Sequence, residues 1–376
     1  MSTPRGSLAD VLPSALDVLG MPGLSDRLEI RASVGEVRRM AVLLVDGLGY
    51  HLLPAAADCS PTLADVVAGR LGSLAELACV FPSTTPTSLV TLGTGALPGA
   101  HGVLGFTVNV PGTDRVLTHV TWRDEPDPAR WQPLPTLFRR AAAAGLRTAV
   151  VSRPEFAGSG LTEAAYGGAR YVGAKRSEQL AERMLAELRA APGLVYGYHP
   201  TLDTIAHLHG IDSPQWQCAA ASVDRLISRL VDGLPADAAL LVTADHGMLD
   251  VPLEARFDIA ADPRLDAGIA VVAGEPRVRY LHTLPGAAGD VMAAWREVLG
   301  AAASVYGRDE LVAAGWFGPV PHEHLARIGD VVVVCHDRAV VLATGREPAT
   351  VAGLVAFHGS TTPAETAIPL IAFRGG

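Results

Sequence analysis

Charged and aromatic side chains are scarce in this chain of 376 residues, at 18% and 5% of the sequence. The formal net charge is -9, and the sequence contains no run rich in lysine and arginine. Because stable binding to nucleic acid depends on a basic face, the composition argues against a nucleic-acid-binding protein. A negatively charged protein can still act on phosphates where bound metal ions supply the positive field.

Long apolar runs and paired cysteines are also missing. No stretch of about 18 apolar residues occurs, so we expect no membrane span. The first residues show no apolar segment behind a basic start, so we expect no secretory signal. Cys59, Cys79, Cys218 and Cys335 are scattered and form no CxxC pair, which is typical of free thiols and small core residues. These features predict a cytoplasmic protein and leave its oligomeric state open.

Apolar runs and amphipathic segments alternate along most of the chain. The expected helices cover 7–19, 62–67, 87–93, 134–144, 177–190 and 214–231, and the expected strands cover 40–45, 77–81, 148–151, 194–198, 238–243 and 367–373. This alternation predicts the α/β class, with a doubly wound, mostly parallel sheet and helices on both faces.

Three segments depart from that rhythm. Residues 1–38 are expected to form an N-terminal arm, and the Gly/Pro-rich stretch 95–115 a loop. Between about 252 and 345, short valine-rich runs alternate with proline, glycine and charges. We therefore predict antiparallel strands in a small inserted α+β lobe, within a single catalytic domain that covers 1–376.

The segment 241–248 carries the clearest chemical signal. An apolar strand ends there in Ala244-Asp245-His246-Gly247. Aspartate offers a hard oxygen and histidine a borderline nitrogen, which suits a divalent cation above the strand end. Gly247 is expected to let the backbone turn away at once. The alternative is a plain hydrogen-bonded Asp–His pair.

Other expected strand ends supply matching residues. Asp46 closes one strand, Asp203 and His207 follow another at a spacing that places them on one helix face, and His358 precedes a late glycine. Open α/β sheets bind ligands at the carboxyl ends of their strands. Three aspartates and three histidines are enough for two divalent-cation sites.

Thr85 lies at an expected helix N-terminus, where backbone N–H groups favour an anion. Each of these pieces also has an ordinary explanation. Asp46-Gly47 can be a turn, His207 and His209 can be surface residues, and the hydroxyl residues of 83–88 can cap a helix. Their shared position beside strand ends favours a functional site.

The order of these motifs resembles the alkaline phosphatase superfamily, and within it the nucleotide pyrophosphatase/phosphodiesterase branch, over roughly residues 40–360. The resemblance rests on Asp46-Gly47, Phe81-Pro82-Ser83-Thr84-Thr85, Thr94-Gly95, Pro98, His101-Gly102, Asp203 with His207, Thr243 to Met248, and His358-Gly359.

The resemblance implies an alkaline phosphatase-like fold and two bound metal ions, usually zinc, with manganese as an alternative. One ion would be held by Asp46, Asp245 and His246. The other would be held by Asp203, His207 and His358. The nucleophile of such enzymes precedes the Thr94-Gly95 pair by nine positions, which implies that Thr85 is the nucleophile and contacts a metal, with Thr84 as the fallback.

The activity implied is that of a two-metal phosphoric ester hydrolase, a phosphodiesterase or nucleotide pyrophosphatase that forms a phospho-threonine at Thr85. Its substrate would be a small phosphate ester or a nucleotide. A phosphomonoesterase or phosphonate hydrolase on the same site is the enzymatic alternative. An inactive metal-binding protein is a further alternative, although no ligand position is missing.

Two departures from the family pattern stand out. Ser88 occupies the position, three residues after the nucleophile, where phosphodiesterases usually carry an asparagine that donates to phosphate; we expect Ser88 to bind substrate there. Thr84 replaces the usual lysine. The nucleophilic cysteine or serine and the following arginine of sulfatases are absent, which argues against sulfate esters.

Residues that would recognise the substrate or orient the ligands are less defined. We expect recognition from 102–125, 155–171 and 252–330. The candidates for stacking on the substrate are Phe106, Trp122, Phe156 and Tyr166, with packing as their ordinary alternative, and the candidates for binding phosphate are Arg123, Arg153 and Arg170. Tyr198 and His209 are candidates for orienting metal ligands, with packing or surface positions as their ordinary alternatives.

Overall fold

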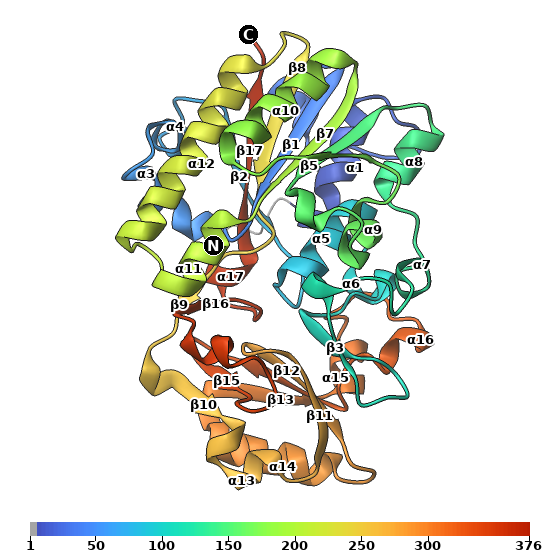
Figure 1. The fold of residues 1–376 in the computed structure, drawn as a ribbon, viewed down its shortest axis with the longest axis vertical. Coiled ribbons are helices and arrows are strands. Elements are labelled where there is room, and N and C mark those ends of the chain that lie inside the picture. The colour runs from blue at the N-terminus through green and yellow to red at the C-terminus, as the bar shows by residue number, and fades with distance from the viewer. Residues whose placement is uncertain (1–5) are drawn as a thin grey trace.

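A seven-stranded sheet forms the centre of the computed structural model, which describes residues 6–376 (Figure 1). The strand order is β2–β17–β8–β1–β7–β5–β6. The strands are β1 (Arg39–Val45), β2 (Ser73–Ala78), β5 (Thr148–Ser152), β6 (Arg170–Gly173), β7 (Gly193–His199), β8 (Ala238–Thr243) and β17 (Ala367–Arg374). Strand β17 is antiparallel to both of its neighbours, whereas β8, β1, β7, β5 and β6 are mutually parallel. The predicted mostly parallel α/β sheet is therefore confirmed.

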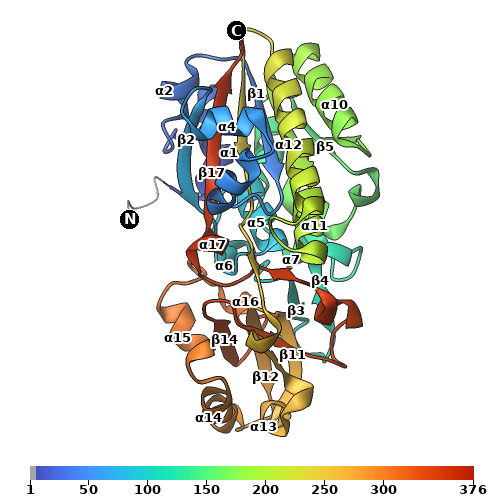
Figure 2. The same ribbon diagram turned by 90° about the vertical axis from the view of Figure 1, so that its left-hand side faces the viewer.

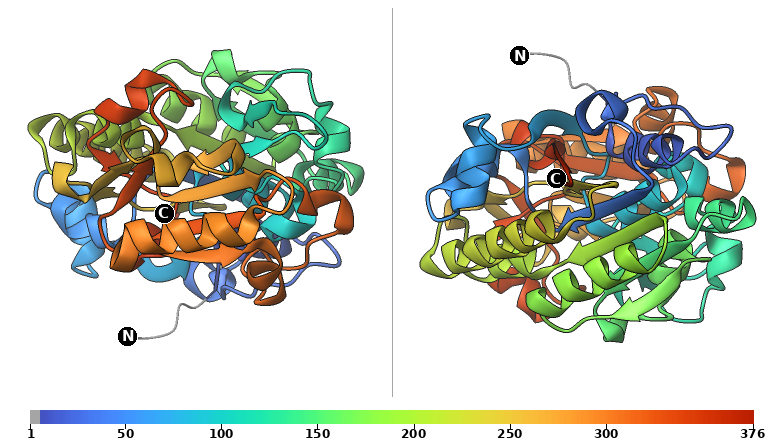
Figure 3. Two further views of the ribbon diagram at one scale, coloured as in Figure 1. Left: turned by 90° about the horizontal axis from the view of Figure 1, so that it is seen from below. Right: turned by 90° about the horizontal axis from the view of Figure 1, so that it is seen from above.

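Helices cover both faces of this sheet (Figures 2 and 3). On one face lie α10 (Ser177–Ala190) and α12 (Pro214–Gly233), and on the other α1 (Val11–Val18), α5 (Thr85–Thr94) and α8 (Leu137–Ala143). The helices around them are α2 (Ile30–Val34), α3 (Leu53–Ala57), α4 (Pro61–Val67), α9 (Gly160–Tyr166) and α11 (Thr201–His209). Every residue of β7 and β8 is buried, as expected for strands covered on two faces.

Two local predictions are wrong. The strand expected at 77–81 lies at Ser73–Ala78, where it pairs with β17. The expected loop 95–115 contains α6 (Pro98–His101) and β3 (Thr107–Asn109), which forms a hairpin with β4 (Val116–Thr118) just after the stretch. Pro98 is well suited to the first turn of a helix, and buried His101 contacts Thr91, so long-range packing orders this stretch. Residues 1–5 of the predicted N-terminal arm lie outside the described residues.

A second sheet lies beyond the carboxyl ends of the parallel strands. Its four antiparallel strands are ordered β11 (Ile269–Glu275), β12 (Val278–Thr283), β14 (Val331–Cys335) and β13 (Ala303–Gly307). Around it lie β10 (Arg256–Asp258), β15 (Val340–Leu342), α13 (Pro263–Asp266), α14 (Ala288–Leu299), α15 (Arg308–Ala313) and α16 (His322–Leu325). Helix α14 lies over this sheet, and its Trp295 is buried in a hydrophobic cluster separate from the main core (Figure 3). The segment is the predicted inserted lobe; the division of the chain into one catalytic domain remains a prediction.

A buried ion pair joins this lobe to the main sheet. Arg277, in the turn between β11 and β12, donates to both carboxylate oxygens of Glu365 at 2.9 and 2.7 Å. Glu365 lies in α17 (Pro363–Thr366), and both side chains are fully buried. The same carboxylate accepts from the backbone N–H of Ser360, two residues after His358. The pair therefore fixes the lobe against the loop that carries His358.

Replacing Arg277 with methionine should destabilise the fold strongly, because it leaves the Glu365 carboxylate buried without its cationic partner. We expect a loss of about 3–5 kcal/mol in the free energy of unfolding, measured by denaturant titration. The control is Arg264→Met, which removes an exposed ion pair with Asp262. It should change the denaturant concentration at the unfolding midpoint far less. Equal midpoint shifts for the two variants would show that the buried pair does not hold the lobe.

None of the helices in the described residues is long and apolar enough to cross a membrane.

Candidate metal centre

Three adjacent parallel strands bring the predicted residues to one edge of the sheet. Strand β1 lies between β7 and β8, with Val45 opposite His199 and Leu44 opposite Thr243. All three strands therefore end at the same level. Asp46 follows β1 directly, and Asp245 and His246 follow β8.

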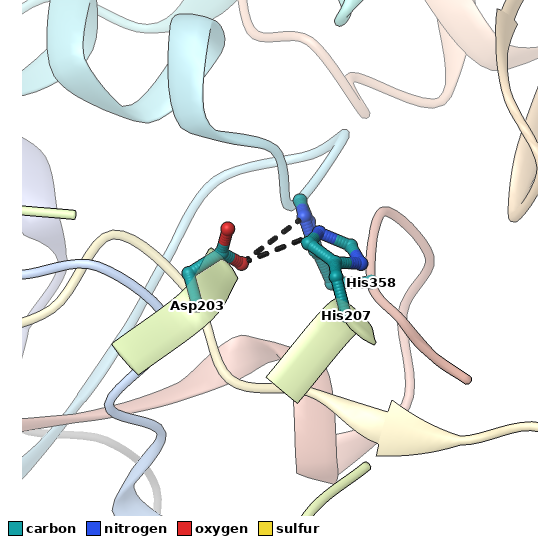
Figure 4. A group of neighbouring side chains, drawn as sticks. All are labelled: Asp203, His207 and His358. Atoms are coloured by element: carbon teal, nitrogen blue, oxygen red, sulfur yellow. Dashed lines mark ion pairs between the residues drawn. The ribbon is translucent and has the colours of Figure 1, made fainter. Parts of the chain in front are cut away.

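The remaining ligand candidates come from α11 and from a short strand pair. Asp203 and His207 lie one turn apart on α11, which follows β7. His358 follows β16 (Ala356–Phe357), which pairs with β9 (Leu249–Asp250). Figure 4 shows the carboxylate of Asp203 facing the rings of His207 and His358.

The first group of candidate ligands surrounds Nε2 of His246. This nitrogen lies 3.4 Å from Oδ1 of Asp46, 3.4 Å from Oδ2 of Asp245 and 3.1 Å from Oγ1 of Thr85. Ligand atoms at the corners of a tetrahedron around zinc are about 3.3 Å apart, given bond lengths of about 2.0–2.1 Å. The distances from Nε2 of His246 to the other three atoms are therefore in the range expected for ligands of one metal ion.

The second group adjoins the first. Oδ1 of Asp203 lies 3.4 Å from Nε2 of His207 and 3.7 Å from Nε2 of His358. Single ligand atoms of Asp46, Asp203 and His246 also lie within 4.8 Å of one another. The two groups are thus neighbours, as a pair of metal ions acting on one phosphoryl group requires.

Backbone carbonyls hold the three imidazole rings in a ligand orientation. In each ring Nδ1 lies 2.7–3.0 Å from a carbonyl oxygen, which assigns the proton to Nδ1 and leaves the lone pair on Nε2. The carbonyls belong to Ala356 for His207, to Gly247 for His246 and to Ser83 for His358. All three free nitrogens point to the carboxylates.

The electrostatics of the site favour a bound cation. Burial raises the pKa of Asp46 well above its ordinary value, and the carboxylates of Asp245 and Asp203 raise it further. Burial likewise raises the pKa of Asp203 and, with His246 and His207 nearby, lowers that of His358 well below its usual range. Oδ1 of Asp203 and Oδ2 of Asp245 have no hydrogen-bond partner among the described residues. The donor set is therefore suited to divalent cations that would neutralise it.

Close packing makes glycine necessary at two positions beside the ligands. Gly47 has a φ of +74° and donates its N–H to Oδ1 of Asp245 at 3.1 Å. A Cβ at Gly247 would lie 2.0 Å from the carbonyl oxygen of Ala364. Gly247 is not among the glycines with a positive φ, so the requirement for glycine at this position is steric.

Thr85 is the first residue of α5, a helix whose ten residues are all buried. Its Oγ1 lies 3.4 Å from Oδ1 of Asp46, and its side chain lines the cavity described below. Thr84, the fallback nucleophile, is fully buried at the N-cap and does not line that cavity. The helix N-terminus adds a field that favours an anion beside Thr85.

A cavity of about 660 Å³ opens between these residues and the lobe. Its walls come from Asp46, Thr85, α11, the hairpin region 106–120 and the lobe residues 272–279, together with 343–358. The predicted recognition segments 102–125 and 252–330 thus contribute, and the segment after 330 contributes as well. Of the aromatic candidates, Phe106 lines the cavity, whereas Trp122 is buried and donates to the carbonyl of Pro126. Phe156 and Tyr166 line a smaller hollow that Thr85 also lines.

Other candidates fall outside the cavity. The hydroxyl of Ser88 donates to the backbone carbonyl of Asp245 at 2.9 Å and does not line the cavity, so the geometry gives Ser88 a role in positioning the Asp245 loop instead of a substrate contact. His209 is exposed on α11. The candidate phosphate-binding arginines Arg123, Arg153 and Arg170 do not line the cavity.

Two further residues lie at the site: Tyr198, a candidate for orienting metal ligands, and Glu275, which the sequence did not predict. Tyr198 donates its hydroxyl to Oδ2 of Asp46 and so orients Oδ1 toward Thr85 and His246. Glu275 ends a valine-rich run. An isolated acidic residue at the end of such a run is the signal in the sequence that could have identified it. It lines the cavity and is buried, and burial raises its pKa to about 8, although the hydroxyl of Thr84 and the guanidinium of Arg279 lower it.

Comparisons with known proteins give three kinds of match. The sequence model of the family described as type I phosphodiesterase / nucleotide pyrophosphatase matches residues 40–361. An uncharacterised pyrophosphatase/phosphodiesterase of Schizosaccharomyces pombe is 26% identical over 204 residues, which is 50% of this chain and 42% of the relative. The chain thus aligns with less than half the length of that relative.

Two solved structures share the fold. Murine ectonucleotide pyrophosphatase / phosphodiesterase 5 superposes with a TM-score of 0.71 at 18% identity, covering 89% of this chain and 88% of that chain. It has also been solved as an inactive variant in complex with AMP. Phosphonoacetate hydrolase from Sinorhizobium meliloti 1021, in complex with phosphonoacetate, superposes with a TM-score of 0.69 at 21% identity, covering 91% of this chain and 93% of that chain.

Proposed function

Because the chain belongs to the type I phosphodiesterase / nucleotide pyrophosphatase family, as its motifs predict, we propose that it is a two-metal hydrolase of phosphodiesters or nucleotide pyrophosphate bonds. The observation that carries the proposal is the position of the Thr85 hydroxyl, 3.1 Å from Nε2 of His246 and 3.4 Å from Oδ1 of Asp46. A hydroxyl that lies among candidate metal ligands is placed so that a bound metal ion could activate it as a nucleophile.

Two divalent ions, which we propose to be zinc, would be divided between the two ligand groups. Asp46, Asp245 and His246 would hold one beside Thr85, and Asp203, His207 and His358 the other. Bound there, such ions would lower the pKa of the nucleophile and neutralise charge on the phosphoryl and leaving oxygens.

The protein's own groups would then perform two displacements. Oγ1 of Thr85 gives up its proton and attacks phosphorus, an Oγ1–P bond forms, and the bond from phosphorus to the leaving oxygen breaks. The departing alcohol or phosphate takes up a proton. Water then attacks the same phosphorus, the Oγ1–P bond breaks, and Thr85 regains its proton. The N-terminus of α5 would stabilise negative charge beside Thr85 in both steps.

Hydrolysis of bis-p-nitrophenyl phosphate and of p-nitrophenyl phosphate tests the proposal, with zinc, manganese and magnesium added separately. We expect the diester to be cleaved with a higher kcat/KM than the monoester, and zinc to support the highest rate. A preference for the monoester would support a phosphomonoesterase on the same site. No hydrolysis of either compound with any metal would contradict the proposed activity.

A further inference from the structure

The proposed phosphoryl transfer makes no use of Glu275, the last residue of β11, although it lines the same cavity. Its side chain is buried, with 5% of the residue exposed, and neither carboxyl oxygen has a hydrogen-bond partner within residues 6–376. A buried carboxyl without partners costs free energy in the folded state, whether it is ionised or not. A group of this kind at the wall of a binding cavity suggests that a ligand completes it.

The nearest cationic group is already engaged elsewhere. Arg279 is 3% exposed and donates to the carbonyl oxygen of Val341 at 2.7 Å and to Oε2 of Glu347 at 2.7 Å. The other arginine at the cavity wall, Arg346, pairs with Asp266. Neither arginine forms an ion pair with Glu275 among residues 6–376, and burial raises the pKa of Glu275 although the charge of Arg279 partly offsets the shift.

Glu275 lies beside the loops that carry the catalytic groups. A Cβ placed on Gly359 would lie 2.9 Å from Cγ and 3.2 Å from Oε1 of Glu275. Gly359 follows His358, and its carbonyl accepts from the backbone N–H of Ser83 at 2.9 Å, two residues before Thr85. A substituent on the reacting phosphorus would consequently pass close to Glu275.

The hydroxyl of Thr84 acts on the Glu275 carboxyl, but it is a single uncharged donor. The cavity wall that includes Glu275 is otherwise largely apolar. It includes Val272, Pro276, Leu354 and Phe357, with Phe106 from the hairpin region. A substrate group that carries N–H donors and a positive charge would therefore complete Glu275 and favour its ionised form.

We propose that Glu275 binds a protonated amine on one ester group of the substrate, so that aminoalkyl phosphodiesters are the substrate class of this enzyme. This inference rests on the proposed function. An ammonium group provides three N–H donors and a positive charge for two unpartnered carboxylate oxygens, whereas an alcohol provides one donor and no charge. Charge-assisted hydrogen bonds of this kind are also the stronger class.

Two matched substrates test the assignment: p-nitrophenyl 2-aminoethyl phosphate and p-nitrophenyl ethyl phosphate, which differ in the amine. We expect the zinc-loaded wild type to favour the amino ester in kcat/KM. Glu275→Gln keeps the shape and removes the charge, and should lower the ratio of the two kcat/KM values by about 10- to 100-fold. The control Glu254→Gln removes an exposed acid of the lobe outside the cavity and should leave the ratio unchanged. An unchanged ratio in Glu275→Gln would overturn the proposal.

A binding measurement separates this inference from the proposed activity. O-phosphoethanolamine and ethyl phosphate are titrated into zinc-loaded wild type and Glu275→Gln by calorimetry. Tighter binding of the amine by the wild type, lost in Glu275→Gln, supports the role of Glu275 even when neither ester is cleaved. Cleavage of the ethyl ester together with equal binding of the two phosphates would retain the phosphodiesterase and reject the amine site.

Discussion

Replacement of Thr85 by alanine is expected to lower turnover of a phosphodiester by at least about a thousandfold, with both metal ions retained. The reason is geometric: the Thr85 hydroxyl lies within 3.4 Å of candidate ligand atoms from Asp46 and His246, at the start of a buried helix. The change removes the attacking oxygen and leaves six of the proposed ligand side chains in place. The measurements are kcat on bis-p-nitrophenyl phosphate and the metal content by elemental analysis.

The chain offers matched controls for this variant. Thr87 lies two residues further along α5, is buried like Thr85 and does not line the cavity. Thr87→Ala should therefore keep most of the turnover per metal-loaded chain. Thr84→Ala tests the fallback nucleophile and should also remain active. Full turnover in Thr85→Ala would show that the nucleophile is assigned to the wrong residue. Loss of turnover in Thr84→Ala instead would identify Thr84 as the nucleophile.

Replacement of His358 by alanine is expected to reduce the bound metal from about two ions to about one per chain and to abolish most turnover. His358 offers Nε2 to the group of Asp203 and His207, and its ring is stacked on that of His246 at a centroid distance of 3.5 Å. Loss of the ring therefore removes one ligand and a support for another. Elemental analysis after dialysis against metal-free buffer measures the number of metal ions bound per chain.

The control for this variant is His209→Ala, which removes an exposed histidine from the same helix as His207. It should keep both ions and full turnover. Asp245→Ala should, in contrast, lose the ion next to Thr85. If His358→Ala retained as much metal as His209→Ala, the division of ligands between two ions would have to be abandoned.

Much of the site could be predicted from the sequence because its residues follow the carboxyl ends of buried parallel strands. The apolar runs that became β1, β7 and β8 are unambiguous, and parallel strands necessarily end at the same edge. Asp46, Asp203 and Asp245 are therefore placed by local patterns alone. His358 required more, because it reaches the site through the pairing of β16 with β9, about a hundred residues apart in the chain, and the family resemblance supplied that link.

What the sequence could not show depends on long-range packing. The stretch 95–115 looks like a loop because its glycines and prolines are read locally, yet contacts with α5 and the lobe order it into α6 and a hairpin. Ser88 lies at a position that implies a substrate contact, but the helix turns its hydroxyl to the carbonyl of Asp245. Glu275 comes from a lobe whose placement over the cavity no local pattern encodes.

The most direct test of the central claim is to locate the covalent intermediate. Zinc-loaded protein is mixed with a large excess of bis-p-nitrophenyl phosphate, quenched in acid during turnover, digested and analysed by mass spectrometry. The account predicts a p-nitrophenyl phosphoryl group on the peptide that contains Thr85, with fragmentation assigning it to Thr85 and not to Thr84. Rapid turnover with no phosphorylated peptide, or with the group on another residue, would contradict it.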